Sequence, residues 1–529
     1  MSSIRSYLVC AFTLTVRPAS SPVVTRPSYP ATFAGMVARE VGSSTCACGA
    51  RIARAMTTAT LPSRLAAVKN AGRFDATVVG TFARYLAEAP DEKLFRMNPY
   101  RYAKETGTPE RVTVDLFLHA AHAGVVEFSW GVLCPICGLF VTTEHALRAL
   151  NEERTCAICE IPIPPVIDDN VEVAFTVAPS TRTIRFHDPE KLDFLRDSFA
   201  LFFSPSVVDS CNFIRCMKNP LWFGTVPPGA KLETEKVLAP GRYVLALPEH
   251  HVVRRFTVDE GADGSASSYE VLAGGQLIQE GERLAAGKVR MSLQNRLGRP
   301  LVFGAFVDPR PTADEVTEAC ANSAKPELNL HRFFTAKELV TTQVFRDLFR
   351  AESIPSQGGL GLKNLTVLFT DLKGSTELYS RMGDMRAYGL VGEHFGLLRE
   401  VVAGHGGAVV KTIGDAVMAS FATPAPALEA AMVMDREIAK VGELELKIGL
   451  HAGPCIAVDL NERLDYFGQT VNIAARVQAI AESRQIVCTD PVRDAPGAAE
   501  VIAGLTLVRG RELAALKGVA GQVGVWRYQ

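Results

Sequence analysis

Hydrophobic residues recur along this chain with two different periods. Residues 60–130 follow a helical pattern, in which apolar positions recur every three or four residues. Residues 232–308 follow a strand pattern instead, with short apolar runs such as 242–247 and 252–258 separated by Gly, Pro and Asp. The two patterns predict a helical unit near the start of the chain and a small β-sandwich in its middle.

The helical unit ends in the order helix, turn, helix and strand, which is typical of a small winged-helix domain. A helix is expected to begin at Pro109, with Thr108 as its N-cap, and to end at Gly124, before a strand at Val125–Trp130. DNA binding would require a basic helix, but this one carries only Arg111 as a strong cation. Nucleic acid is therefore not an expected partner.

A further helix is predicted at residues 335–350. Thr335 and Glu338 have the spacing of a capping box, which satisfies free N–H groups at a helix start. The apolar residues after them recur at helical spacing and are Leu339, Val340, Val344, Leu348 and Phe349. A single amphipathic helix at this position is well placed to transmit a change between the first half of the chain and its last third.

Two aspartates each follow an apolar stretch of strand length. Asp371 comes directly after residues 365–370, and Gly374-Ser375-Thr376 then begins an amphipathic segment, whose first N–H groups would face an anion. Gly414-Asp415 separates two short apolar runs, a pattern typical of a two-residue β-hairpin. A pair of carboxylates beside such a helix start suits Mg²⁺ bound to a polyphosphate, because Mg²⁺ prefers oxygen ligands.

A third segment carries an amide and a guanidinium group. Thr470 is expected to be the N-cap of a helix, which places Asn472 and Arg476 one turn apart on the same face. Such a pair suits the negative charge that develops on a phosphoryl group during its transfer.

These three segments resemble the catalytic domain of class III nucleotidyl cyclases, over roughly the last third of the chain. The resemblance implies the cyclase fold, a ferredoxin-like antiparallel sheet with helices, for residues 362–529. It also implies two Mg²⁺ or Mn²⁺ ions per site, held by Asp371, Asp415 and the carbonyl group of Leu372. Because the sites of this family form between two copies of the domain, it implies a homodimer.

The same resemblance implies ATP as the substrate. Lys411 and Asp465 match the pair that reads adenine in adenylyl cyclases, where guanylyl cyclases carry Glu and Cys. Asn472 and Arg476 match the pair that orients the ribose and stabilises the pentavalent phosphorus. Lys517 resembles a lysine that contacts the triphosphate. The expected function is therefore that of an adenylate cyclase, which forms cyclic AMP and pyrophosphate.

Each of these residues also has a structural explanation. An aspartate after a strand is often a turn residue, a lysine often only solvates a surface, and Asn472 and Arg476 could hydrogen-bond on a helix surface. The ordered set of three segments favours catalysis over these explanations. Two functional alternatives stay open. One is a guanylate cyclase, which Lys411 and Asp465 disfavour, and the other is a nucleotide-binding regulator without turnover that acts through a partner or DNA.

Four cysteines form two CxxC pairs in the first half of the chain. Their spacing is typical of a zinc ribbon, and the residues are Cys134, Cys137, Cys156 and Cys159. Four thiolates leave no open position on the metal, so the zinc would be structural; the alternatives are unmetallated turns or a redox pair. This half of the chain resembles an uncharacterised domain found ahead of some bacterial cyclases.

Composition adds limits on location and partners. With 529 residues and a formal net charge of -1, the chain has no overall attraction to nucleic acid or anionic lipid. Because it has no run of about eighteen apolar residues and its 12 cysteines are scattered, a cytoplasmic protein without a membrane span is expected. Residues 7–16 resemble a signal segment but lack a cleavage site, which favours a disordered tail.

These observations predict a multidomain α+β protein whose first half regulates its last third. The expected boundaries are a disordered tail at 1–58, a winged-helix-like unit at 59–131, a zinc ribbon at 132–165, a β-rich sandwich-like domain at 166–310, a coupling helix and linker at 311–361, and a nucleotidyl cyclase domain at 362–529.

Overall fold

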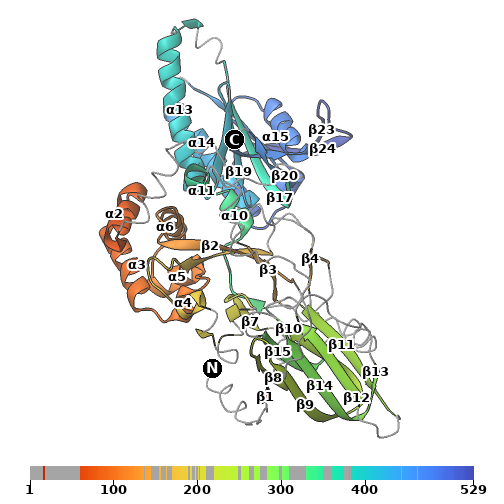
Figure 1. The fold of residues 1–529 in the computed structure, drawn as a ribbon. Coiled ribbons are helices and arrows are strands. Elements are labelled where there is room, and N and C mark those ends of the chain that lie inside the picture. Colours follow the sequence, from red (N-terminus) through yellow and green to blue (C-terminus); the bar gives the residue numbers. More distant parts are fainter. Residues whose placement is uncertain are drawn as a thin grey trace, which may run out of the picture.

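The structure is a computed structural model of the 529-residue chain (Figure 1). It describes residues 16–17, 60–135, 138–144, 154–156, 162–163, 170–188, 191–192, 197, 200–201, 203–209, 220–247, 252–260, 267–273, 283–296, 301–308, 329–349, 359–374, 380–381, 383–441, 444–460 and 463–529. The predicted tail at 1–58 therefore lies outside the described residues, apart from a two-residue strand, β1 (Val16–Arg17). Among the described residues, no helix is long and apolar enough to cross a membrane.

A helical unit follows the tail and packs on a small sheet. Its helices are α2 (Leu61–Gly72), α3 (Ala76–Glu88), α4 (Asp91–Leu94), α5 (Pro99–Thr106) and α6 (Glu110–His122). The sheet has the order β3 (Phe140–Glu144), β2 (Val126–Leu133), β6 (Val171–Val177). Phe82, Phe117 and Phe175 are fully buried between them.

The boundaries of α6 agree with the sequence pattern to within two residues. The helix begins at Glu110 rather than Pro109, which occupies the N-cap position, and Gly124 follows its end with a positive φ of 69°. Strand β2 then pairs antiparallel with β6, more than forty residues later in the chain. This long-range pairing joins residues that sequence analysis assigned to separate domains, and a winged-helix arrangement stays a prediction.

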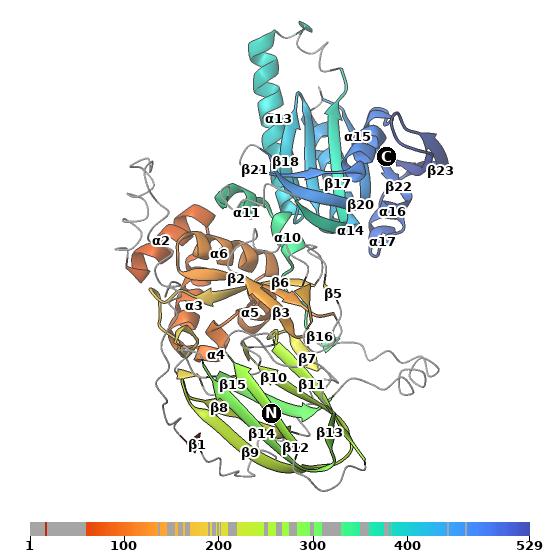
Figure 2. The same cartoon turned by 45° about the vertical axis from the view of Figure 1, so that its right-hand side comes forward.

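Two sheets face each other in the middle of the chain (Figure 2). One has the order β13 (Arg283–Ala285), β11 (Val252–Asp259), β10 (Gly241–Leu247), β15 (Leu301–Val307), β8 (Pro220–Val226). The other has the order β1, β9 (Lys231–Leu238), β14 (Gly287–Asn295), β12 (Ser267–Ala273). Phe256 and Phe303 of the first sheet share one buried cluster with Met291 and Leu293 of the second. This is the two-layer packing of a β-sandwich.

The predicted single helix at 335–350 is wrong, because the structure has two short helices there. They are α10 (Ala336–Val340) and α11 (Gln343–Leu348). The capping box is confirmed, since the Glu338 N–H donates to Thr335 Oγ1 at 3.1 Å and the Thr335 N–H donates to Glu338 Oε2 at 2.9 Å. The break follows from Thr341 and Thr342, whose hydroxyl groups both donate to the Glu338 carbonyl and so compete with continued helix.

The C-terminal domain is a mixed sheet with helices on both faces. The strand order is β18 (Ala408–Ile413), β19 (Ala416–Phe421), β17 (Leu360–Leu372), β20 (Leu446–Leu460), β22 (Gln485–Thr489), β24 (Gln522–Tyr528), β23 (Leu507–Ala515), with β21 (Arg463–Phe467) paired to β20. Of these pairs only β20 and β22 run parallel. The predicted mixed α+β class is confirmed.

Side chains along β17 alternate between the two faces of the C-terminal sheet. Leu368 and Leu372 belong to a buried cluster with α13 (Asp384–Gly404) and α14 (Pro424–Val441). Val367 and Phe369 point to the opposite face and belong to the cluster that includes α15 (Gln469–Ala479).

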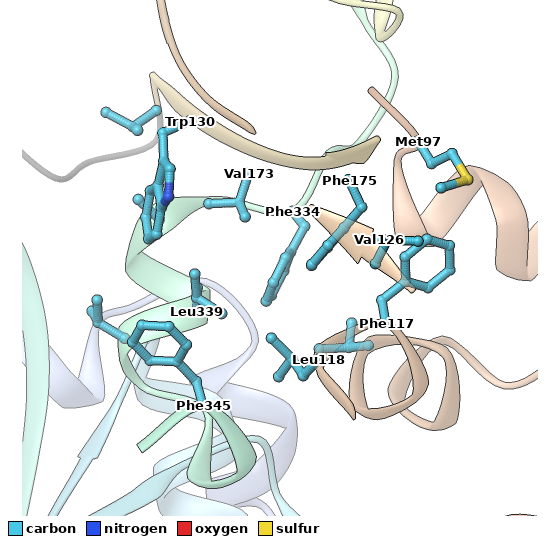
Figure 3. Packing of buried hydrophobic residues seen from close by; sticks show 14 of the residues in the cluster. Met97, Phe117, Leu118, Val126, Trp130, Val173, Phe175, Phe334, Leu339 and Phe345 are labelled. Carbon is cyan, nitrogen blue, oxygen red and sulfur yellow. The ribbon is translucent and has the colours of Figure 1, made fainter. Parts of the chain in front are cut away.

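The second of these clusters continues out of the C-terminal domain. Figure 3 shows Leu339 of α10 and Phe345 of α11 in one cluster with Leu118 of α6 and Phe175 of β6, and Phe334 lies between Leu339 and Phe175. The same buried cluster contains Val367 of β17. Helices α10 and α11 thus lie between the helical unit and the C-terminal sheet, as Figures 1 and 2 also show.

Candidate functional site

Asp371 and Asp415 meet at one end of the C-terminal sheet. Asp371 is the next-to-last residue of β17, and Asp415 lies in the turn between β18 and β19. The strands bring them together because Thr370, next to Asp371, pairs with Val417. Burial and the nearby charge of Asp415 raise the pKa of Asp371, while Lys447 opposes this shift.

This carboxylate pair fits a divalent cation. The Oδ2 atom of Asp415 is buried and has no hydrogen-bond partner among the described residues. A buried carboxylate oxygen without a donor is costly, and a second carboxylate close enough to raise a pKa adds repulsion. A cation that takes oxygen ligands would relieve both costs. Leu372, the predicted carbonyl ligand, is the last residue of β17 and its side chain is buried.

The hairpin that carries Asp415 is confirmed as predicted. Ile413 pairs with Ala416, which leaves only Gly414 and Asp415 in the turn. Gly414 has a φ of 63°, a left-handed conformation that disfavours residues with a Cβ. The helix start predicted at Ser375-Thr376 lies outside the described residues.

Lys411 and Asp465 form an ion pair. Lys411 Nζ lies 2.5 Å from Asp465 Oδ2, and Asp465 Oδ1 accepts a hydrogen bond from the Tyr466 N–H at 2.8 Å. The Lys411 side chain is 40% exposed and that of Asp465 only 11%, so the pair opens to solvent on the lysine side. A register shift between Val409 and Lys411 marks a bulge in β18, a feature that re-aims the side chain after it.

Asn472 and Arg476 are exposed and lie one turn apart on α15, as predicted. The predicted N-cap is wrong. Gly468 occupies that position with a φ of 140°, and the Thr470 hydroxyl instead donates to the Pro454 carbonyl at 2.5 Å. The helix start is therefore fixed by a contact with β20 that no local pattern reveals.

The other predicted residues are Lys517 and the four cysteines. Lys517 is exposed in the turn between β23 and β24. Cys134 and Cys156 are both buried in the same hydrophobic cluster, whereas Cys137 and Cys159 lie outside the described residues. The described residues contain no group of three or more His, Cys, Asp or Glu that could hold a metal ion. The zinc ribbon stays a prediction.

His394 on α13 was not among the residues predicted from the sequence. The residue is buried, both ring nitrogens lack a hydrogen-bond partner among the described residues, and burial lowers its pKa to about 4 even though the charge of Asp415 acts in the opposite direction. The available signal was its position on the apolar face of the helix, between Val391 and Leu398.

In comparisons with known proteins, the C-terminal domain and the segment before it match two different families. A family described as "Family of unknown function (DUF5939)" matches residues 61–347, and the "Adenylate and Guanylate cyclase catalytic domain" matches residues 361–497. An adenylate cyclase of Lachancea kluyveri is 31% identical over 208 residues, which are 33% of this chain and 11% of that protein. A pH-sensitive adenylate cyclase of Mycobacterium tuberculosis is 29% identical over 198 residues, 37% of this chain and 47% of that protein. The chain thus spans less than half the length of either relative.

Solved structures also resemble the C-terminal domain. The adenylyl cyclase CyaB from P. aeruginosa is 21% identical, with a TM-score of 0.29, and the match covers 32% of this chain and 96% of that one. A guanylate cyclase domain from Catenaria anguillulae is 23% identical, with a TM-score of 0.28, over 32% of this chain and 97% of that one. The first of the two family matches covers more than half of the chain. The chain therefore belongs to the DUF5939 family of unknown function, and it carries a class III adenylate and guanylate cyclase catalytic domain at residues 361–497.

Proposed function

We propose that this protein is an adenylate cyclase that converts ATP to 3′,5′-cyclic AMP and pyrophosphate. The observation that carries the proposal is the ion pair between Lys411 and Asp465. Adenine carries an amino donor at position 6, where guanine carries a carbonyl acceptor. The Asp465 carboxylate would accept a hydrogen bond from the amino group of adenine, whereas the guanine carbonyl would face it as a second acceptor. Lys411 would donate to a ring nitrogen.

The ribose 3′-oxygen would attack the α-phosphorus as the bond to the bridging oxygen of pyrophosphate breaks. The hydroxyl proton would pass to solvent or to the substrate, so that no side-chain base is required. Asn472 would orient the ribose, and Arg476 would stabilise the charge on the pentavalent phosphorus. Both side chains are exposed, which leaves them accessible to a nucleotide. Lys517 would contact the triphosphate.

Asp371, Asp415 and the Leu372 carbonyl would hold the divalent metal, two Mg²⁺ or Mn²⁺ ions per site. When bound, these ions supply Lewis acidity toward the 3′-hydroxyl group and the leaving pyrophosphate. The raised pKa of Asp371 and the orphaned Oδ2 of Asp415 support this assignment.

We further propose that a second copy of the chain completes the site. Large apolar side chains are exposed beside the Lys411–Asp465 pair, on β18 and on the β20–β21 hairpin. They are Ile413 at 54%, Ile456 at 41%, Leu460 at 48% and Phe467 at 66% exposure. Exposed apolar surface of this kind is typical of a protein interface. Because one domain carries both the proposed metal-binding residues and the proposed base-reading residues, two copies of that domain can complete each other's sites. A structural zinc held by Cys134, Cys137, Cys156 and Cys159 is also proposed, on their spacing alone.

The test is product formation by the purified chain. ATP and GTP are each incubated with the protein and Mg²⁺ or Mn²⁺, and cyclic nucleotides are separated and quantified. We expect cyclic AMP from ATP. Cyclic GMP as the main product would favour the guanylate alternative, and nucleotide binding without either product would favour a regulator without turnover.

A further inference from the structure

Helix α11 contacts the strand that carries Lys411. The Gln343 side chain is buried, and its Oε1 atom accepts a hydrogen bond from the backbone N–H of Val409 at 2.8 Å. Its Nε2 atom donates to Asp347 Oδ1 at 3.0 Å, so the amide is held at both ends. Strand β18 is the edge strand of the sheet, and Val409 adjoins the bulge before Lys411. Gln343 therefore fixes the edge strand at the point where it turns Lys411 toward Asp465.

Helices α10 and α11 contact both sequence neighbours of Asp465, which are Leu464 and Tyr466. The Arg346 guanidinium donates a hydrogen bond to the Leu464 carbonyl and lies 5.7 Å from the centre of the Tyr466 ring. The Tyr466 hydroxyl donates to the Val340 carbonyl of α10 at 3.1 Å. Tyr466 is buried, so this bond is shielded from water. Asp465 thus lies between two residues that are both tied to α10 or α11.

The sheet alone does not determine the separation of Lys411 and Asp465. Strand β18 pairs with β19, while β21 pairs with β20, and β17 lies between β19 and β20. The strands that carry the two residues are therefore not neighbours in the hydrogen-bonded ladder. Helices α10 and α11 contact both strands and connect them outside that ladder.

These helices belong to the DUF5939 segment, which ends at residue 347. Leu339 and Phe345 are buried in the same cluster as Leu118 of the helical unit and Phe175 of the sheet beneath it, as Figure 3 shows. The backbone also joins the two parts, because the Val173 N–H donates to the Phe334 carbonyl at 2.8 Å. A displacement of the helical unit would therefore be transmitted to α10 and α11 through a packed interior.

We propose that α10 and α11 hold the Lys411–Asp465 pair in its base-reading geometry, so that the DUF5939 segment controls nucleotide affinity and base selectivity. The inference rests on the proposed function of that pair. Gln343, Arg346 and Tyr466 are positioning residues in this account, since none of them is assigned a contact with the nucleotide. Their loss should affect KM and selectivity more than kcat, because the groups that act on the phosphorus are on α15 and at the carboxylate pair.

The test compares Arg346→Ala and Tyr466→Phe with wild type in the full chain. Each removes one anchor of β21, and loss of a buried hydrogen bond corresponds to roughly a 5- to 20-fold effect. We expect KM for ATP to rise by about that factor and the preference for ATP over GTP to fall, with kcat within about threefold. Arg493→Ala, which removes an exposed arginine of the short helix α16 (Asp490–Arg493) that pairs with Asp494, is the matched control and should change neither.

Tyr466→Phe removes only a hydroxyl group, so it keeps the test decisive if Arg346→Ala does not fold. Unchanged KM and selectivity in Tyr466→Phe, or a fall in kcat equal to the fall in kcat/KM, would overturn the inference. If wild type forms no cyclic nucleotide, the proposed function fails by itself. In that case, calorimetric Kd values for non-hydrolysable ATP and GTP analogues decide the positioning role. We expect both variants to bind the ATP analogue more weakly than wild type does. Equal binding would contradict the inference.

Discussion

Lys411 Nζ and Asp465 Oδ2 lie 2.5 Å apart although their strands, β18 and β21, do not pair with each other. The ion pair bridges the edge of the C-terminal sheet and a hairpin that extends from its centre. This arrangement places a cation and a carboxylate side by side in a partly exposed position, where each can also contact a ligand. The proposal that ATP is the substrate rests on this feature.

Asp415→Asn should abolish most of the activity without loss of stability. The substitution removes one of the two carboxylates proposed to bind the metal, and we expect cyclic AMP formation to fall by at least about a hundredfold. Burial and the charge of Asp415 together raise the pKa of Asp371, and the substitution removes the second of these causes, so the melting temperature should stay the same or increase. Asp494→Asn, an exposed carboxylate on the same domain, serves as the control for both measurements. Wild-type activity in Asp415→Asn would refute the metal assignment.

Asp371 should make stability depend on pH in the absence of divalent metal. Burial and Asp415 raise its pKa above the usual 3.8, so the folded state holds this proton more tightly than the unfolded state. Stability contributed by the group is therefore greatest below the usual pKa and declines as the pH rises through the raised value. We expect the free energy of unfolding of wild type minus that of Asp371→Asn to decrease with pH from about 4 upward. A difference that increases with pH contradicts this picture.

Arg476→Ala should lower kcat rather than binding. A guanidinium that acts on charge present only in the transition state contributes roughly a hundredfold to a thousandfold in rate. Because Arg476 is exposed, its removal should leave the melting temperature unchanged. Steady-state kinetics with ATP provide the measurement, and Arg509→Ala provides an exposed arginine control on β23. A large rise in KM with an unchanged kcat would instead assign Arg476 to ground-state binding.

Elemental analysis of the purified protein tests the zinc ribbon. We expect about one zinc per chain, lost in Cys137→Ser, because a structural site needs all four thiolates. Cys320→Ser removes a cysteine outside the two CxxC pairs and should retain the metal. Zinc-free protein with an unchanged melting temperature would favour unmetallated turns.

Local chemistry explains what could be predicted from the sequence. The hairpin at Gly414-Asp415, the capping box at Thr335 and the helix that carries Asn472 and Arg476 each depend on residues close together in the chain. The alternating pattern of the sandwich strands likewise reports burial on one face.

Contacts between distant segments explain which features could not be predicted from the sequence. The Thr470 hydroxyl bonds to Pro454 instead of capping its helix, and Gln343 bonds to Val409, sixty-six residues away. The pairing of β2 with β6 crosses a segment that sequence analysis assigned to a separate domain. The periodicity of hydrophobic residues does not predict such contacts, because they depend on how complete helices and strands pack together.

Nucleotide selectivity measures the central claim most directly. The values of kcat/KM for ATP and for GTP are determined for wild type and for the double variant Lys411→Glu with Asp465→Cys. We expect wild type to prefer ATP by at least about tenfold and the double variant to lose that preference, since an acceptor and a donor exchange places. A wild-type protein that forms no cyclic AMP, or a double variant that keeps the full preference for ATP, would contradict the account.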